Sequence, residues 1–156
     1  MKVPKLAVIR IRGGVGAKAD ALDTLRLLGL TRVNHCVLVD GTPSILGMLQ
    51  KVKDYVTWGE IDAEMLELLI RKRGRVEGNR RMTDDVAKKM VGLSISEMAP
   101  SICEGKIDLS AIRGLKKVFR LHPPRKGFKA LRRPYRDLGD LGYRGREIND
   151  LLRRMV

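Results

Sequence analysis

The chain has 156 residues, of which 44% are hydrophobic and only 4% aromatic. This length allows one aliphatic core and is too short for two large domains, and the periodic apolar residues argue against disorder throughout. The formal net charge of +14 comes from 32 Lys and Arg against 18 Asp and Glu. Such a surplus favours a polyanionic partner, most commonly nucleic acid, although a soluble protein that is merely basic is the alternative.

Targeting and redox features disfavour several other classes of protein. The start of the chain, MKVPKLAVIRIRGG, has a short apolar run with arginines inside it, so we expect no signal peptide. No window contains the ~20 apolar residues of a membrane span. Cys36 and Cys103 are far apart and lack ligand-like companions. This favours small buried thiols in a reducing cytosol over a disulfide framework or a zinc site.

Residues 1–60 are predicted to form a compact α/β unit. They carry nine basic and five acidic residues, a balance of +4. Apolar residues alternate in the first strand, which predicts that Arg10 and Arg12 share its polar face. In chain order the predicted elements are a strand at 5–12, a helix at 20–29, a strand at 35–40, a helix capped by Thr42 and a strand at 54–58.

Residues 61–112 are predicted to be a helical region. They carry nine basic and nine acidic residues and are therefore neutral as a group. Acids gather where the first helix begins and bases where it ends, an arrangement that suits the helix dipole. The predicted helices are 61–74, 83–92 and 94–105, the last broken at Pro100, and a loop at 75–81 joins the first two.

Most of the charge surplus lies in residues 113–156, where fourteen Lys or Arg face four Asp or Glu. The run LKKVFRL at 115–121 alternates like a returning strand. Residues 122–147 have too little apolar periodicity to pack alone, and 147–156 could close with one or two helical turns. We therefore expect an extended basic C-terminal segment, and a folded core after removal of residues 122–156.

The sequence RGGVGAK at 12–18 follows a strand and precedes a helix, as phosphate-binding loops do. A P-loop requires a lysine followed by a hydroxyl residue, but Ala19 follows Lys18 here. The dinucleotide pattern also fails, because its third glycine is missing. Glycine amides beside basic side chains still suit an anion, and the phosphate of a nucleic-acid backbone is the simplest candidate.

The titratable residues form no catalytic constellation. His35 begins an apolar strand, where a strand-end role is more common than that of a base. His122 lies in a basic segment, where stacking or a phosphate contact is more plausible than catalysis. Asp84 and Asp85 begin a helix, and its dipole explains them without acid–base chemistry. We expect no enzyme activity, no cofactor, no metal and no small-molecule substrate.

The segment FRLHPPRKGFKALRRPYR at 119–136 is the strongest functional signal. Its arginines match phosphate oxygens, and its interleaved aromatic residues could stack on unpaired bases. The alternative is a disordered tail that only increases solubility. A second basic group, RKRGRVEGNRR at 71–81, lies at a helix end and loop, where a solvated face explains it almost equally well.

Residues 24–61 resemble the large-subunit ribosomal protein family numbered thirty in bacteria and seven in eukaryotes. The resemblance rests on Leu25, Leu28-Gly29-Leu30, Asn34-His35, Asp40 with Thr42-Pro43, Gly47-Met48 and Val52. Bacterial members are about as long as residues 1–60 alone. The helical region and FRLHPPRKGFK at 119–129 resemble the longer archaeal and eukaryotic members. No long basic N-terminal extension is present, so the chain resembles the archaeal branch.

This resemblance implies an α+β fold with a small ferredoxin-like β-α-β-α-β core and a three-stranded antiparallel sheet. The pattern alone would suggest parallel pairing. The implied function is that of a cytoplasmic structural protein of the large ribosomal subunit, bound to ribosomal RNA and neighbouring ribosomal proteins. A nucleotide-binding enzyme and an RNA chaperone or modification-complex subunit outside the ribosome remain alternatives.

The predicted RNA-binding residues fall into three groups. From the first strand, loop and helix start, the resemblance carries over Arg10, Arg12, Gly13, Gly14 and Lys18. From the archaeal-type ending, it carries over Arg120, His122, Arg125, Lys126, Phe128 and Lys129. Beyond residue 130 charge alone assigns Arg132, Arg133, Arg136, Arg144 and Arg146.

Overall fold

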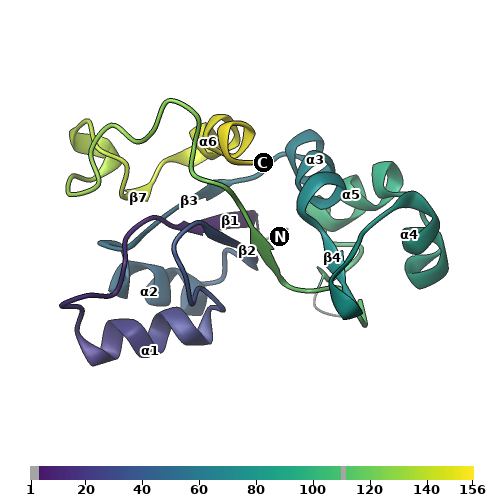
Figure 1. Cartoon of the computed structure of the whole chain (residues 1–156), viewed down its shortest axis with the longest axis horizontal. Helices are drawn as coiled ribbons and strands as arrows, with labels where there is room; N and C mark the ends of the chain where they lie inside the picture. The colour runs from purple at the N-terminus through teal and green to yellow at the C-terminus, as the bar shows by residue number, and fades with distance from the viewer. Residues whose placement is uncertain (1–3, 110–111) are drawn as a thin grey trace.

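The computed structural model of the protein describes residues 4–109 and 112–156 (Figure 1). The first three residues of the predicted 1–60 unit and residues 110–111 of the predicted helical region lie outside the described part. The chain builds a mixed five-stranded sheet in the order β6-β2-β1-β3-β7, with helices on both of its faces. The expected α+β class is therefore confirmed.

Three of the five strands belong to the first 60 residues. They are β1 (Lys5–Arg10), β2 (His35–Asp40) and β3 (Val56–Glu60). The central strand β1 pairs antiparallel with both neighbours. The sheet is larger than the expected three-stranded core: β6 (Val118–Arg120), which lies within the returning strand predicted at 115–121, joins β2 antiparallel, and β7 (Gly142–Tyr143), which was not predicted, joins β3 in parallel.

Two helices cover one face of the sheet. They are α1 (Ala19–Leu27) and α2 (Pro43–Lys51), which lie together below the strands in Figure 1. The predicted cap of α2 is confirmed, since Thr42 Oγ1 accepts a hydrogen bond from the Ile45 amide. Side chains of Val8, Val37 and Trp58 point to this face and form a core with apolar residues of both helices.

The larger core lies on the other face. It joins alternate strand residues, including Ile9, Cys36 and Phe119, to the later helices. These helices are α3 (Ala63–Arg73), α4 (Asp84–Val91), α5 (Ile95–Cys103) and α6 (Ile148–Met155). The predicted break at Pro100 is wrong: α5 continues through this residue, which lies on the exposed side of the helix.

The loop predicted at 75–81 is a short hairpin. It consists of β4 (Arg75–Val76), the 3-10 helix η1 (Glu77–Asn79) and β5 (Arg80–Arg81). Val76 also forms a bridge with Leu115, so the returning chain passes beside this hairpin before it enters β6. Strands of two residues leave almost no periodicity in the sequence, which explains why a loop was predicted.

The C-terminal segment folds back on β3. It contains η3 (Tyr135–Asp137), β7, η4 (Gly145–Glu147) and α6. Gly59 allows η4 to lie against β3, because a Cβ atom there would overlap the Gly145 carbonyl. Asn149 reinforces this contact by accepting a hydrogen bond from the Asp62 amide at 3.1 Å and donating one to the Glu60 carbonyl at 3.1 Å.

Candidate nucleic-acid interface

Basic side chains from distant parts of the sequence gather where strands β1, β2 and β6 meet at one end of the sheet. Ile9 pairs with Cys36, so the next residues, Arg10 and His35, lie opposite one another, and His35 pairs with Arg120. Residues paired across antiparallel strands point to the same face. The sheet-edge cluster defined here consists of Arg10, Arg12, Arg32, His35 and Arg120.

Arg10 holds this edge together from inside the protein. Its side chain is only 6% exposed and donates hydrogen bonds to the Leu30 carbonyl at 2.9 Å and the Arg12 carbonyl at 3.0 Å. Burial lowers the pKa of its guanidinium below the usual value. The structure therefore contradicts the placement of Arg10 on a solvent-facing side of the strand. Arg10 positions the loop, because its donors already face backbone carbonyls.

The glycine loop at 12–18 is closely packed at one point and open elsewhere. A Cβ atom on Gly14 would lie 2.8 Å from the Leu22 side chain, so this glycine permits close packing. Arg12 donates to the Asp54 carbonyl at 3.1 Å, and its guanidinium lies 5.8 Å from the centre of the Tyr55 ring. Gly13 and Lys18 are exposed and are thus accessible to an anion.

Positive charge dominates the surroundings of His35. Burial lowers the pKa of its imidazole most, and the charges of Arg120, Arg32 and Arg10 lower it further. The ring is therefore neutral near pH 7. His35 Nδ1 and Asn34 Oδ1 are both buried and lack a hydrogen-bond partner among the described residues.

Two residues of the cluster are not among the RNA-binding residues predicted from the sequence. His35 was predicted only as the end of a strand, and it is indeed the first residue of β2. Arg32, which is exposed, was not selected. The run TRVNH just before β2 carried the signal, but its relation to Arg10 and Arg120 depends on the strand register.

The C-terminal loop, residues 122–146, presents the largest group of exposed cations. The chain here is not simply extended: the Arg125 amide donates to the Arg154 carbonyl, and the Arg154 side chain donates to the Gly127 carbonyl. Lys126 has a left-handed backbone at the tip of this turn. The predicted site residues that this segment exposes are Arg125, Lys126, Lys129, Arg132, Arg133, Arg136 and Arg146.

Arg144 differs from the other predicted residues because it is buried, at 7% exposure. Its guanidinium donates to the Thr57 hydroxyl at 2.8 Å and to the Asp140 carbonyl at 2.7 Å, and it lies 4.9 Å from the centre of the Tyr135 ring. It also pairs with the buried Asp140 carboxylate at 3.2 Å. The structure thus contradicts an outward-facing Arg144, which fastens the loop internally.

Asp140 fixes the other side of the same loop. Its second carboxylate oxygen accepts a hydrogen bond from the Ala130 amide at 2.9 Å, and its own amide approaches the carbonyls of Ala130 and Arg133. A buried acid–base pair with its remaining lone pairs satisfied is a rigid connection. The exposed arginines at 132, 133 and 136 are therefore displayed by an internally braced loop.

The aromatic and histidine residues of this region have mainly structural contacts. Phe119 is fully buried in the core, and Phe128 is half-buried and packs against the same core. His122 Nε2 lies 2.8 Å from the Val156 carbonyl and Nδ1 lies 2.6 Å from the Pro123 carbonyl. Arg120, in contrast, is exposed at the sheet edge.

Residues 4–109 and 112–156 contain no group of three or more His, Cys, Asp or Glu suited to a metal ion. None of the helices in this part of the chain is long and apolar enough to cross a membrane. Cys36 is buried, which raises the pKa of its thiol to about 12, whereas Cys103 is half-buried.

The mixed sheet and the exposed cations described above define a basic α+β protein. Residues 6–56 match the family described as Ribosomal protein L30p/L7e. Over 152 residues the chain is 49% identical to the large ribosomal subunit protein uL30 of Thermoplasma volcanium. The aligned region covers 97% of this chain and 92% of the relative.

Two further archaeal relatives carry the same name. The uL30 protein of Methanopyrus kandleri is 49% identical over 94% of this chain and 100% of its own length. That of Archaeoglobus fulgidus is 51% identical over 96% of this chain and 98% of its own length. The chain belongs to the ribosomal protein L30p/L7e family. The resemblance to its archaeal branch is confirmed.

Proposed function

We propose that this protein binds large-subunit ribosomal RNA through two basic surfaces, the sheet-edge cluster with its glycine loop and the C-terminal loop. Its family is structural and not enzymatic, and its relatives are named as proteins of the large ribosomal subunit. The protein is accordingly a structural constituent of that subunit, located in the cytoplasmic ribosome. Its partners are ribosomal RNA and ribosomal proteins.

The observation that carries the proposal is the display of cations without acidic partners on both basic surfaces, one of them an internally braced loop. Lys18, Arg32, Arg120 and the exposed residues of the C-terminal loop form no salt bridge within the described part of the chain. Rigid presentation reduces the entropy lost on binding. Lys and Arg side chains that replace counterions on phosphates then supply salt-dependent affinity, and surface shape supplies fit to folded RNA.

The test measures binding of the full chain to large-subunit ribosomal RNA at increasing salt. With six to ten phosphate contacts, affinity should fall by roughly 10³–10⁵ between about 50 and 200 mM salt. Substitution of Arg132 and Arg133 by Gln should reduce the slope of log affinity against log salt by about 1 per residue.

The matched control removes the same charge from α4. Lys88 and Lys89 are exposed there, outside both proposed surfaces. The double variant K88Q/K89Q should keep nearly the wild-type slope. A flat salt response of the wild-type protein, or equal losses in the two double variants, would contradict the proposal.

We also propose that residues 1–60 form a ferredoxin-like core, followed by a helical insertion at 61–112 and a returning segment at 113–156. The antiparallel strands β1, β2 and β3, with α1 and α2 on one face, support this description. Expression of residues 1–60 alone tests it. A cooperative thermal transition would support an independent unit, and an unfolded fragment would contradict one.

A further inference from the structure

A second group of cations lies in the helical region. Lys72 and Arg73 end α3, Arg75 begins β4 and Arg81 ends β5. These four residues and Val156 line a cavity of about 470 Å³, named here the hairpin pocket. In Figure 1 the loop that follows β1 lies at the left of the molecule, whereas β4 lies right of centre, between the sheet and α4.

The register of the hairpin places two like charges face to face. Arg75 pairs directly with Arg81 across the antiparallel strands, and Arg80 opposes Val76. Like charges directly opposite one another in an antiparallel pair repel and destabilise it. The dipole of α3 favours Lys72 and Arg73 at its C-terminal end, but it does not explain arginines on the strands that follow. The arrangement favours an anion bound between Arg75 and Arg81.

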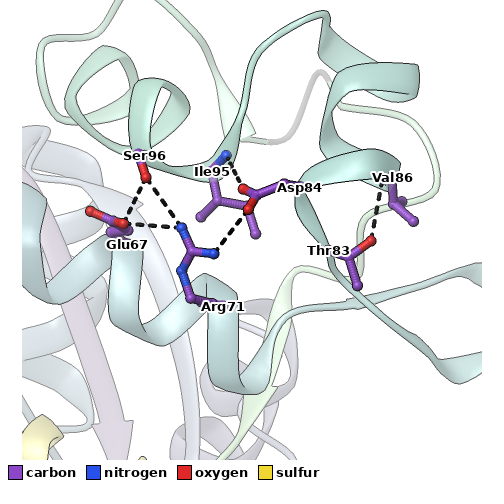
Figure 2. A network of polar contacts seen from close by, with 7 residues as sticks. All are labelled: Glu67, Arg71, Thr83, Asp84, Val86, Ile95 and Ser96. Atoms are coloured by element: carbon purple, nitrogen blue, oxygen red, sulfur yellow. Dashed lines mark hydrogen bonds and ion pairs between the residues drawn. The ribbon is translucent and has the colours of Figure 1, made fainter.

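Nearby carboxylates do not neutralise the pocket. Figure 2 shows that Glu67 and Asp84 both face Arg71: each accepts a hydrogen bond from its guanidinium at 3.1 Å. The Ser96 hydroxyl donates to the same Glu67 oxygen that accepts from Arg71, and the Ile95 amide donates to the other Asp84 oxygen. The carboxylates of Glu67 and Asp84 therefore face α4 and α5 and do not pair with the cations of the hairpin pocket.

The pocket cations have no acidic partner, although one nitrogen of the Arg75 guanidinium donates to the Gly74 carbonyl at 3.1 Å. Lys72, Arg73, Arg75 and Arg81 form no salt bridge with any residue in 4–109 or 112–156. Glu77 is the acid of the hairpin, and it is exposed and forms no ion pair in the same part of the chain. At Val156, the carbonyl lies within hydrogen-bond distance of His122 Nε2.

We propose that the hairpin pocket binds a phosphate group of the RNA backbone, as a third contact separate from the sheet-edge cluster and the C-terminal loop. Planar arginine donors match phosphate oxygens in bidentate fashion, and an anion between Arg75 and Arg81 turns their repulsion into shared attraction. The proposal rests on the RNA-binding function above. It adds that the protein holds two separate RNA segments at once.

The experiment measures binding of large-subunit ribosomal RNA by the full-length double variant R75Q/R81Q. We expect the Kd to rise on the order of tenfold at about 100 mM salt, and the salt slope to fall by about 2. The Tm of the free protein should stay the same or rise, because the cross-strand repulsion is removed. A purely structural role for the two arginines predicts a lower Tm instead.

The control K88Q/K89Q separates a local contact from a general effect of charge. A larger loss in R75Q/R81Q than in this control supports the hairpin pocket, and equal losses overturn it. If the wild type binds RNA tightly and R75Q/R81Q matches it, this inference fails while the proposed function stands. If the wild type does not bind, the proposed function itself fails.

If R75Q/R81Q does not fold, a second variant tests the contact between the hairpin pocket and phosphate. The pair R75K/R81K keeps both charges but loses the planar donor forks. We expect a weaker affinity with a nearly unchanged salt slope. Wild-type affinity in this variant would overturn the bidentate contact.

Discussion

Arg144 shows how burial changes what a charged residue does. In the sequence it belongs to a basic stretch and was predicted to contact RNA. In the structure its guanidinium lies between Thr57, Asp140 and Tyr135. Burial is the largest influence on its pKa and lowers it, whereas Asp140 raises it. Arg144 therefore acts on RNA binding only by bracing the loop.

Replacement of Arg144 by Met should lower the free energy of unfolding by roughly 3–5 kcal/mol. The reason is that the Asp140 carboxylate would remain buried without its charged partner. Urea denaturation measures this change. The matched control R136M removes an exposed arginine of the same loop and should alter stability by less than about 0.5 kcal/mol. Wild-type stability in R144M would contradict the burial described here.

Helices α3, α4 and α5 are joined by the polar network in Figure 2. Arg71 of α3 binds both Glu67 and Asp84, and Asp84 accepts a further hydrogen bond from the Ile95 amide at the start of α5. The Ile95 amide and then Arg71 lower the pKa of the Asp84 carboxyl. A single carboxylate thus connects the beginnings of α4 and α5 to the last turn of α3.

The pH dependence of stability tests this connection. A carboxyl whose folded pKa is depressed contributes stability above its ordinary pKa of about 4, and this contribution is lost as pH falls further. D84N should therefore lower the Tm at pH 7, and the difference from wild type should shrink below about pH 4. The adjacent control D85N, which does not contact Arg71, should show a smaller difference at pH 7. If the difference in Tm between D84N and the wild type did not change with pH, the network would be contradicted.

The chain closes on itself through its C-terminal helix. Ile148, Leu151, Leu152 and Met155 are fully buried against the core formed by α3, α5 and one face of the sheet. Residues 122–156 are thus part of the fold, and the basis for expecting a folded core without them is contradicted. Helix α6 matches the one or two helical turns expected at 147–156, but its packing against the core depends on residues far away in the chain.

Removal of residues 122–156 should abolish cooperative thermal unfolding, followed by circular dichroism, because it exposes this core. A milder test is L151A, which should lower the free energy of unfolding by roughly 2–5 kcal/mol. R153A, on the exposed side of α6, serves as its control and should have little effect. A sharp melting transition in the truncated chain would restore the original expectation.

The sequence by itself determined the elements that have strong local signals. Thr42 accepts the hydrogen bond expected at the start of α2, Thr83 accepts the equivalent bond at the start of α4, and Gly29 follows α1 with a left-handed backbone. These features depend on neighbours in the chain, so composition and spacing reveal them. The α+β class, the family and the basic character of the C-terminal region could also be predicted.

Only the tertiary structure decided which charges are available to a partner. Arg10 and Arg144 looked like Lys18 and Arg132 in sequence, yet the first two are buried and internally bonded. Strand register brought Arg120 beside His35, and folding placed Arg75 against Arg81. Burial and pairing across strands depend on contacts between residues far apart in the chain, and the local pattern of residue types does not encode them.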